Sequence, residues 1–139
     1  MNHEVDRLLA NPYLETLAFV SVALVAMILF LAIFEAVTRY SVWNEIKRGN
    51  MAVAMATSGK IFGICNIFRF AIQQEDTLLI SLGWAAFGYV ILLAAYFIFE
   101  FLTPNFNTDE EIGKGNKAIG LISMVLSVSL SYIIGASVI

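Results

Sequence analysis

Glu45-Ile46-Lys47-Arg48-Gly49-Asn50 and Glu111-Ile112-Gly113-Lys114-Gly115-Asn116 are two versions of one polar stretch, and each joins two long apolar segments. An FE-x-x-T pattern precedes each version, at Phe34–Thr38 and at Phe99–Thr103. Because the two patterns keep nearly the same spacing in both halves, the chain is predicted to be an internal duplication. The repeats would cover about residues 12–72 and 77–139 of a single transmembrane domain that spans residues 1–139.

The composition is that of an integral membrane protein. Hydrophobic residues make up 60% of the chain and charged residues 14%, against about 45–50% and 25% in soluble domains. Crossing a hydrocarbon core of about 30 Å takes about 20 helical residues. Four runs are long enough: about Leu14–Val37, Met51–Ile72, Leu78–Leu102 and Ala118–Ile139. The predicted fold is all-α, a membrane four-helix bundle made of two tandem, parallel helix-linker-helix repeats.

The connections between the spans predict the topology. Only Gln73-Gln74-Glu75-Asp76 separate the second and third spans, so these spans should be antiparallel neighbours. Both repeated linkers then fall on one face of the membrane and both termini on the other. Cytoplasmic loops are enriched in lysine and arginine, and the linkers hold most of these residues: Arg39, Lys47, Arg48, Lys114 and Lys117. We therefore expect cytoplasmic linkers and external termini.

Each linker is predicted to hold one or two turns of helix next to the membrane. Gly49 and Gly115 can end such a helix, and Asn50 and Asn116 can then cap the following span. In the second linker, Thr108-Asp109-Glu110-Glu111 matches a capping box at a solvated helix start. A direct functional role for the repeated motif, including Glu45 and Glu111, stays open beside this structural interpretation.

Stripes of small residues predict close helix contacts. Gly59 and Gly63 form a G-x-x-x-G pattern in the second span, and the fourth span carries small residues at a four-residue spacing: Ser123, Ser127, Ser131 and Gly135. Such stripes let helix backbones approach closely in lipid. They indicate contacts within one subunit or between subunits without distinguishing the two, and we expect a homo-oligomer in the bilayer.

Three ionisable residues lie inside the apolar runs, namely Glu35, Glu100 and Lys60. Charges in a membrane usually face a bundle interior, pair, or line a water path. Lys60 lies ten residues beyond Asn50, which is about 15 Å along a helix. With Asn66 these residues form a candidate polar path or ion site. The alternative is structural, with Lys60 paired to Glu35 or Glu100 and the glutamates holding the linkers in place.

Several functional classes find no support in the residues. The one histidine is His3, so no Ser/His/Asp triad and no zinc cluster can be assembled. The basic residues form no nucleic-acid footprint, and the single cysteine, Cys65, cannot form an intrachain disulfide. We expect no enzymatic activity, no cofactor, no metal and no nucleic-acid partner.

The repeated E-I-x-[RK]-G-N-x-A stretch resembles the DUF350 family of small bacterial membrane proteins, also called UPF0719 transmembrane proteins. The resemblance covers nearly the whole chain, with signatures at Gly49-Asn50-Met51-Ala52 and Gly115-Asn116-Lys117-Ala118. It implies a multipass protein of the bacterial cytoplasmic membrane whose biochemical function is unknown. Some members are encoded among genes linked to envelope stress and membrane remodelling. Lys60 stands where the family is expected to carry small or apolar residues.

Two functional hypotheses follow. The first is a small homo-oligomeric channel or transporter, because ionisable groups lie inside lipid-spanning runs. The second is a non-conducting scaffold or partner subunit whose cytoplasmic linkers dock a membrane or cytoplasmic protein of an envelope-stress system.

Overall fold

The protein is an all-α membrane bundle. The computed structural model describes residues 7, 10–38, 40–74, 77–101 and 108–137, and the side chains of residues 99–101 are not described. Arg39, Glu75, Asp76 and Thr103, which the sequence predictions use, lie outside these residues. Six helices are described: α2 (Pro12–Val37), α3 (Val42–Lys47), α4 (Met51–Gln74), α5 (Leu78–Phe101), α6 (Thr108–Gly113) and α7 (Lys117–Ser137).

The four long helices confirm the four predicted spans, and their ends differ from the predictions by at most two residues where the structure describes them. α2, α4, α5 and α7 are each long and apolar enough to cross a membrane. α2 begins as its sequence predicts, because the side chain of Asn11 accepts a hydrogen bond from the Tyr13 N–H at 3.0 Å and Pro12 occupies the first turn. At about 1.5 Å per residue its 26 residues exceed a hydrocarbon core of about 30 Å, so α2 tilts or protrudes.

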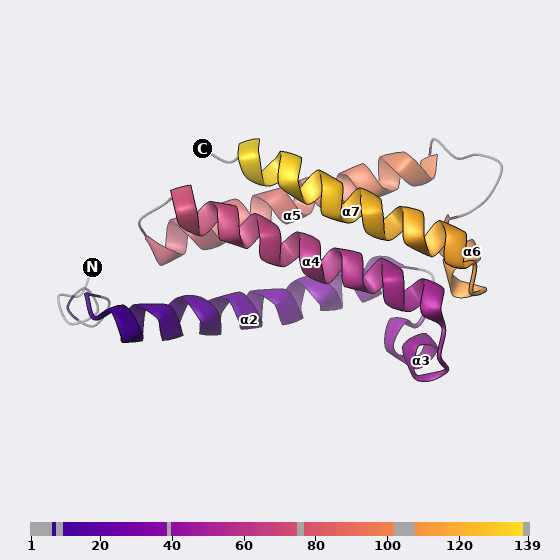
Figure 1. The fold of residues 1–139 in the computed structure, drawn as a ribbon, viewed down its shortest axis with the longest axis horizontal. Coiled ribbons are helices and arrows are strands. Elements are labelled where there is room, and N and C mark those ends of the chain that lie inside the picture. Colours follow the sequence, from indigo (N-terminus) through magenta and orange to yellow (C-terminus); the bar gives the residue numbers. More distant parts are fainter. Residues whose placement is uncertain (1–6, 8–9, 39, 75–76, 102–107, 138–139) are drawn as a thin grey trace.

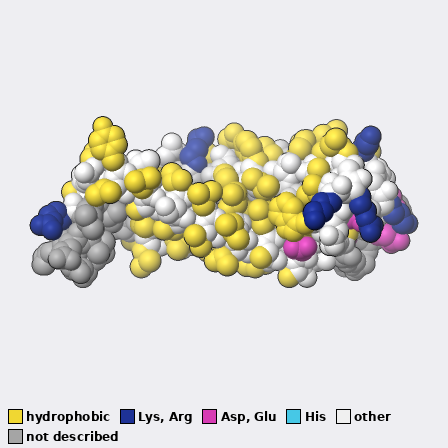
Figure 2. Space-filling model, turned by 90° about the horizontal axis from the view of Figure 1, so that it is seen from below, with side chains coloured by type: hydrophobic (Ala, Val, Ile, Leu, Met, Phe, Trp, Pro, Cys, Tyr) yellow, Lys and Arg dark blue, Asp and Glu magenta, His cyan; other side chains and the backbone are white. Residues whose placement is uncertain are grey.

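The two short helices lie at the same end of the bundle. Figure 1 shows α3 and α6 together at one end, called here the elbow end. The start of α2, the end of α4 and the start of α5 lie at the other end, called here the hairpin end. In Figure 2 hydrophobic side chains cover the visible face between these ends, and most of the visible charged side chains gather at the elbow end. This distribution suits a body in lipid and an elbow in water.

α4 is the central helix, although it is the least apolar of the spans. The mean hydropathy of its most apolar stretch is 1.4, with 61% of those residues buried, against 3.0 and 17% for α2. α4 packs most extensively against α7, then against α5, and α2 makes fewer contacts with α4 and α5. Polarity therefore follows burial here, as expected where the solvent is lipid and polar groups face inward.

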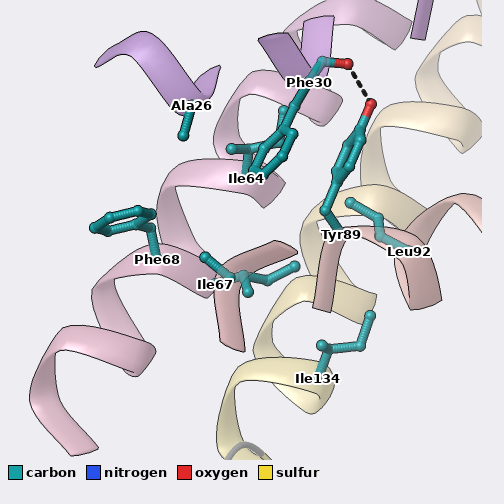
Figure 3. Close-up of a cluster of buried hydrophobic side chains, with 9 residues drawn as sticks. Ala26, Phe30, Ile64, Ile67, Phe68, Tyr89, Leu92 and Ile134 are labelled. Atoms are coloured by element: carbon teal, nitrogen blue, oxygen red, sulfur yellow. Dashed lines mark hydrogen bonds between the residues drawn. The ribbon is translucent and has the colours of Figure 1, made fainter. Parts of the chain in front are cut away.

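An apolar core lies nearer the hairpin end and joins all four spans (Figure 3). The Phe30 and Tyr89 rings stack with their centroids 4.5 Å apart, and the Tyr89 hydroxyl donates a hydrogen bond to the Phe30 carbonyl at 2.5 Å. The Phe30 carbonyl lies inside α2, where the helix uses one of its lone pairs. Tyr89 therefore binds the second lone pair and links α5 to α2. Ile67 and Ile134 complete the core from α4 and α7.

α4 and α7 approach each other at backbone contact distance, and glycines make this approach feasible. A Cβ atom on Gly59 would lie 2.7 Å from the Cα of Met124, and one on Gly120 would lie 2.7 Å from the Ala52 carbonyl oxygen. The buried serines of α7, which are Ser123, Ser127 and Ser131, belong to the same close interface. The small-residue stripes thus meet within one chain.

Candidate functional site: a buried lysine and the elbow that reaches it

Each repeated polar stretch folds into the same hydrogen-bonded corner. The N–H of Asn50 bonds the Glu45 carbonyl and the N–H of Gly49 bonds the Ile46 carbonyl, both within 3.0 Å, with Gly49 at a φ of 83°. This is a Schellman motif, which requires a left-handed residue that glycine provides most easily. The same two bonds recur in the second corner, from Asn116 to Glu111 and from Gly115 to Ile112, and Gly115 has a φ of 91°.

The asparagine that ends each short helix also begins the next span. The side-chain oxygen of Asn50 accepts from the Val53 N–H at 3.2 Å, and that of Asn116 accepts from the Ile119 N–H at 3.4 Å. Each side-chain amide donates to the glutamate that opens its motif, Glu45 or Glu111, at 3.1 Å. One residue therefore satisfies groups of two helices and fixes the angle between them.

The first corner makes a contact that the second corner lacks, and this contact joins the two corners. The amide nitrogen of Asn50 also lies 3.0 Å from the Gly113 carbonyl oxygen and 3.4 Å from that of Ile112, the last carbonyls of α6. Among the described residues, the amide of Asn116 donates to Glu111 alone. Asn50 consequently holds α6 against the start of α4.

Lys60 is the centre of a buried cluster to which five helices contribute. Its ammonium group donates a hydrogen bond to the Ser127 hydroxyl and lies 4.5 Å from the ring centroid of Tyr96 and 5.4 Å from that of Phe34. The Tyr96 hydroxyl donates to the carboxylate of Asp109. These residues are called here the Lys60 cluster, and each comes from a different helix: Phe34 from α2, Lys60 from α4, Tyr96 from α5, Asp109 from α6 and Ser127 from α7.

Lys60 and Asp109 are the buried basic and acidic side chains of the described part of the interior. Lys60 is 0% exposed and Asp109 is 2% exposed, and the Asp109 charge acts on Lys60. A desolvated cation–π contact contributes about 2 kcal/mol, which offsets part of the about 2.5–3.5 kcal/mol that a midplane lysine costs on insertion scales. The Ser127 hydroxyl and the partly compensating Asp109 charge reduce that cost further.

The structure buries Asp109, whereas the sequence predicts a solvated position for it in the second linker. The Asp109-Glu110-Glu111 run was expected to be a solvated helix start, with Thr108 as the capping residue. Instead Thr108 is the first residue of α6, its hydroxyl is buried, and that hydroxyl has no hydrogen-bond partner among the described residues. α6 docks under the bundle and places Asp109 inside, where no linear pattern predicts it.

Tyr40 lies over the elbow end of the cluster. Its Cβ lies 3.4 Å from where a Cβ on Gly113 would be, and its hydroxyl is buried with no hydrogen-bond partner among the described residues. Burial and, secondarily, the charge of Asp109 raise the pKa of the Tyr40 phenol. Tyr40 therefore stays neutral and marks the boundary between the Lys60 cluster and the elbow surface.

A seam of polar side chains continues from Lys60 along the contact between α4 and α7. Asn66 donates to the Ser131 hydroxyl at 3.0 Å, and Ser131 donates to the Val128 carbonyl at 2.6 Å. Thr57 lies one helical turn nearer the elbow end than Lys60, and Ser123 lies one turn nearer than Ser127. Both hydroxyls are buried and have no hydrogen-bond partner among the described residues. A cavity of about 40 Å³ adjoins this seam.

Apolar packing closes the seam toward the hairpin end. A Cβ on Gly88 would lie 2.6 Å from the Ile67 side chain and 3.2 Å from that of Ile134, and one on Gly135 would lie 2.2 Å from the Phe70 ring. The polar route that begins at Asp109 therefore stops beyond Asn66. In this conformation the described part of the chain has a polar interior that apolar packing closes at the hairpin end, and it forms no open pore.

The structure brings together only part of the predicted site. Lys60 and Asn66 both face α7, in line with a polar seam. Glu35 is partly exposed on α2, and among the described side chains it forms no ion pair with Lys60. Glu100 lies in α5, but its side chain is outside the described residues. Within the described residues no three His, Cys, Asp or Glu side chains are grouped so that they could hold a metal ion.

This fold and this cluster define a class: a small multipass α-helical membrane protein with an ionisable group in its interior. The chain belongs to the family described as Domain of Unknown Function (DUF350), whose model matches residues 7–138. It is similar to the UPF0719 transmembrane protein YshE of Bacillus subtilis (strain 168), with 52% identity over 128 residues that cover 92% of this chain and 96% of that protein. No solved structure matches the chain.

Proposed function

We propose that the protein is a small proton-coupled transporter or gated channel in which Lys60 is the proton-binding group inside the membrane. The observation that carries this proposal is the fully buried Lys60, joined through Tyr96 to the buried carboxylate of Asp109. Intramembrane ionisable groups are costly, and they mark proton relays and ion pathways more often than they serve as packing. A purely structural core gains nothing from a lysine at this depth, because an apolar residue would pack there without a desolvation cost.

The geometry gives the relay a direction. Asp109 belongs to α6 at the elbow end, Tyr96 bridges it to the centre, and Lys60 lies where the polar seam between α4 and α7 begins. The Tyr96 hydroxyl and Asp109 are hydrogen-bonded, whereas Lys60 contacts the face of the Tyr96 ring. A proton can pass between groups within hydrogen-bond reach or through one water, so we propose that a water molecule completes the relay between the hydroxyl and the Lys60 amine. We propose that the elbow end faces the bacterial cytoplasm, in agreement with its lysine and arginine content, so that Lys60 exchanges protons with the cytoplasm.

The closed hairpin end favours a gated device over a permanently open pore. Ile67, Gly88 and Ile134 pack tightly across the seam, so conduction requires a second conformation in which this packing opens. α2 is the least buried span and is the element best able to move.

We include in this proposal that the two halves are tandem repeats and that the protein acts as a homo-oligomer without enzymatic activity.

Proton flux into liposomes tests the proposal directly. Purified protein is reconstituted with a pH-sensitive dye inside, and a proton gradient with a potassium diffusion potential drives uptake. We expect measurable flux that Lys60→Met reduces to the level of protein-free liposomes. Tyr96→Phe, which keeps the ring against Lys60 but removes the hydroxyl, should slow flux strongly. Lys114→Met is the matched control, because the Lys114 side chain is 63% exposed and pairs with Glu110 outside the membrane.

Two results would refute this function. Equal flux through the wild type and Lys60→Met would remove Lys60 from the pathway, and wild-type flux no greater than that of protein-free liposomes at any imposed gradient would exclude proton coupling. The Tyr96→Phe variant separates a relay from a structural role, because a structural ring is preserved in that variant.

A second candidate is a non-conducting partner subunit, and the joined elbows favour it. Asn50 fixes α6 to α4, so that both elbows form one rigid surface with Lys47, Arg48 and Lys114 exposed. We propose that such a surface would bind an acidic face of another envelope protein. Charge reversal at Arg48 and Lys114 should then abolish a specific cross-link in native membranes, and Arg7→Glu at the opposite end should not. A cross-link that survives the reversal contradicts this candidate.

A further inference from the structure

The cavity beside Lys60 has the chemical character of an ion-binding site. It has a volume of about 40 Å³ and is lined by Leu92, Ala95, Tyr96, Ser123, Leu126, Ser127 and Leu130. A space of about 10–15 Å³ already suffices for one water-sized group, so the cavity has room for a small ion or a few waters. Among the described residues that line it there is no acidic side chain.

Two hydroxyl groups in this cavity have hydrogen atoms that no described group accepts. When it is protonated, Lys60 is a donor only, so the Ser127 oxygen accepts from it and the Ser127 hydrogen is left to point elsewhere. Ser123 is 1% exposed, and its hydroxyl has no hydrogen-bond partner among the described residues. An unpaired buried hydroxyl costs about 1–3 kcal/mol, so both serines favour an acceptor inside the cavity.

The positive charge of Lys60 next to the cavity favours an acceptor that is negatively charged. The Lys60 ammonium donates to the hydroxyl of Ser127, which lines the cavity, and the Tyr96 hydroxyl donates to Asp109. The remaining lining is hydrocarbon, so a water molecule that accepts from both serines would leave its own hydrogens unpaired. A monovalent anion has no hydrogens to place, accepts from both serines, and neutralises the nearby ammonium.

We infer that the cavity lined by Ser123 and Ser127 binds a small monovalent anion of halide size beside Lys60. This inference deepens the proposed function, on which it rests, by naming the class of ion that accompanies the proton at the same site. The anion would be held by two O–H donors and by the Lys60 charge, in surroundings where charge-assisted hydrogen bonds are about twice as strong as neutral ones.

Equilibrium binding of bromide to the purified protein tests the site without requiring transport. Thermal unfolding is followed in sodium bromide, sodium chloride and sodium gluconate at equal ionic strength, and bromide binding is measured directly by the broadening of its NMR line. We expect saturable stabilisation by both halides and none by gluconate, which is too large for the cavity. Ser123→Ala should weaken bromide binding by about tenfold, because it removes one hydrogen bond to a charged group.

Two further variants complete the test. Ser137→Ala is the matched control on the same helix, because its exposed hydroxyl bonds the Ile133 carbonyl far from the cavity, and it should bind bromide like the wild type. Ala95→Leu should abolish binding by filling the cavity while both serines remain. If Ala95→Leu does not fold, Ser123→Ala decides the question alone.

The outcomes separate this inference from the proposed function. Equal stability in halide and gluconate, or undiminished bromide binding by Ser123→Ala, overturns the anion site and leaves proton flux to be judged by itself. Halide binding that disappears in Ser123→Ala, in a protein that conducts no protons, supports the site and refutes proton coupling.

Discussion

Replacing Gly59 with alanine should separate the two central helices and lower the stability of the bundle. The new Cβ would lie 2.7 Å from the Met124 Cα and 3.0 Å from its carbonyl oxygen. Reaching an ordinary contact of 3.4 Å requires a displacement of about 0.7 Å, and backbone atoms cannot rotate away as a side chain can. Overpacking of this kind costs about 1–3 kcal/mol.

The displacement also reaches the functional cluster. Gly59 precedes Lys60, and Met124 lies one helical turn before Ser127, so the helices would separate where Lys60 donates its hydrogen bond. We therefore expect Gly59→Ala to lower the free energy of unfolding by about 1–3 kcal/mol and to reduce proton flux. Reversible unfolding in mixed micelles, followed by circular dichroism, gives the free energy.

Gly83→Ala is the matched control. Nothing lies within 4 Å of a Cβ at Gly83, so the same chemical change meets open space there and should raise helix stability by up to about 1 kcal/mol. If Gly59→Ala is as stable as Gly83→Ala, α4 and α7 do not pack at backbone distance, and the arrangement of the Lys60 cluster is refuted with them.

Three further predictions concern the elbow end. Asn50→Ala should cost about 2 kcal/mol and Asn116→Ala about 1 kcal/mol, because only Asn50 also binds α6; equal losses in unfolding experiments would contradict the bridge. Gly115→Ala should cost about 1–2 kcal/mol, because its φ is positive, and an unchanged unfolding midpoint would argue against the corner. Since burial and Asp109 raise the pKa of Tyr40, its contribution to stability is complete below about pH 10 and is lost as the pH rises above this value. Tyr40→Phe should flatten that alkaline decline, and an identical decline in both proteins would exclude Tyr40 as its source.

The sequence predicted the spans and their corners because those signals are local. The length of apolar runs, the Asn11-Pro12 start of α2 and the Gly-Asn dipeptides each act within a few residues of themselves, and the structure places helix ends at all of them. The placement of both linkers at one end follows from counting crossings.

The partners of Lys60 could not be predicted, because they depend on how helices far apart in the sequence pack. The glutamates of the FE-x-x-T patterns were the expected partners, since they are the other ionisable groups within the spans. The observed contacts are Ser127, which looked like one of several packing serines, and Tyr96. The Tyr96 hydroxyl in turn donates to Asp109, which lies in a linker. Only the docking of α6 under the bundle brings that aspartate inside, and no periodicity in a helix of six residues reveals which side it buries.

The bridge from Asn50 to α6 has a mechanical consequence. The residue that anchors α6 also begins α4, and α6 carries the carboxylate that acts on Lys60. A molecule that pulls on α6 from outside the bilayer would therefore shift Asp109 relative to the lysine and strain the first turn of α4 at the same time. Tension at the surface would in this way be converted into a change of electric field at the centre of the protein.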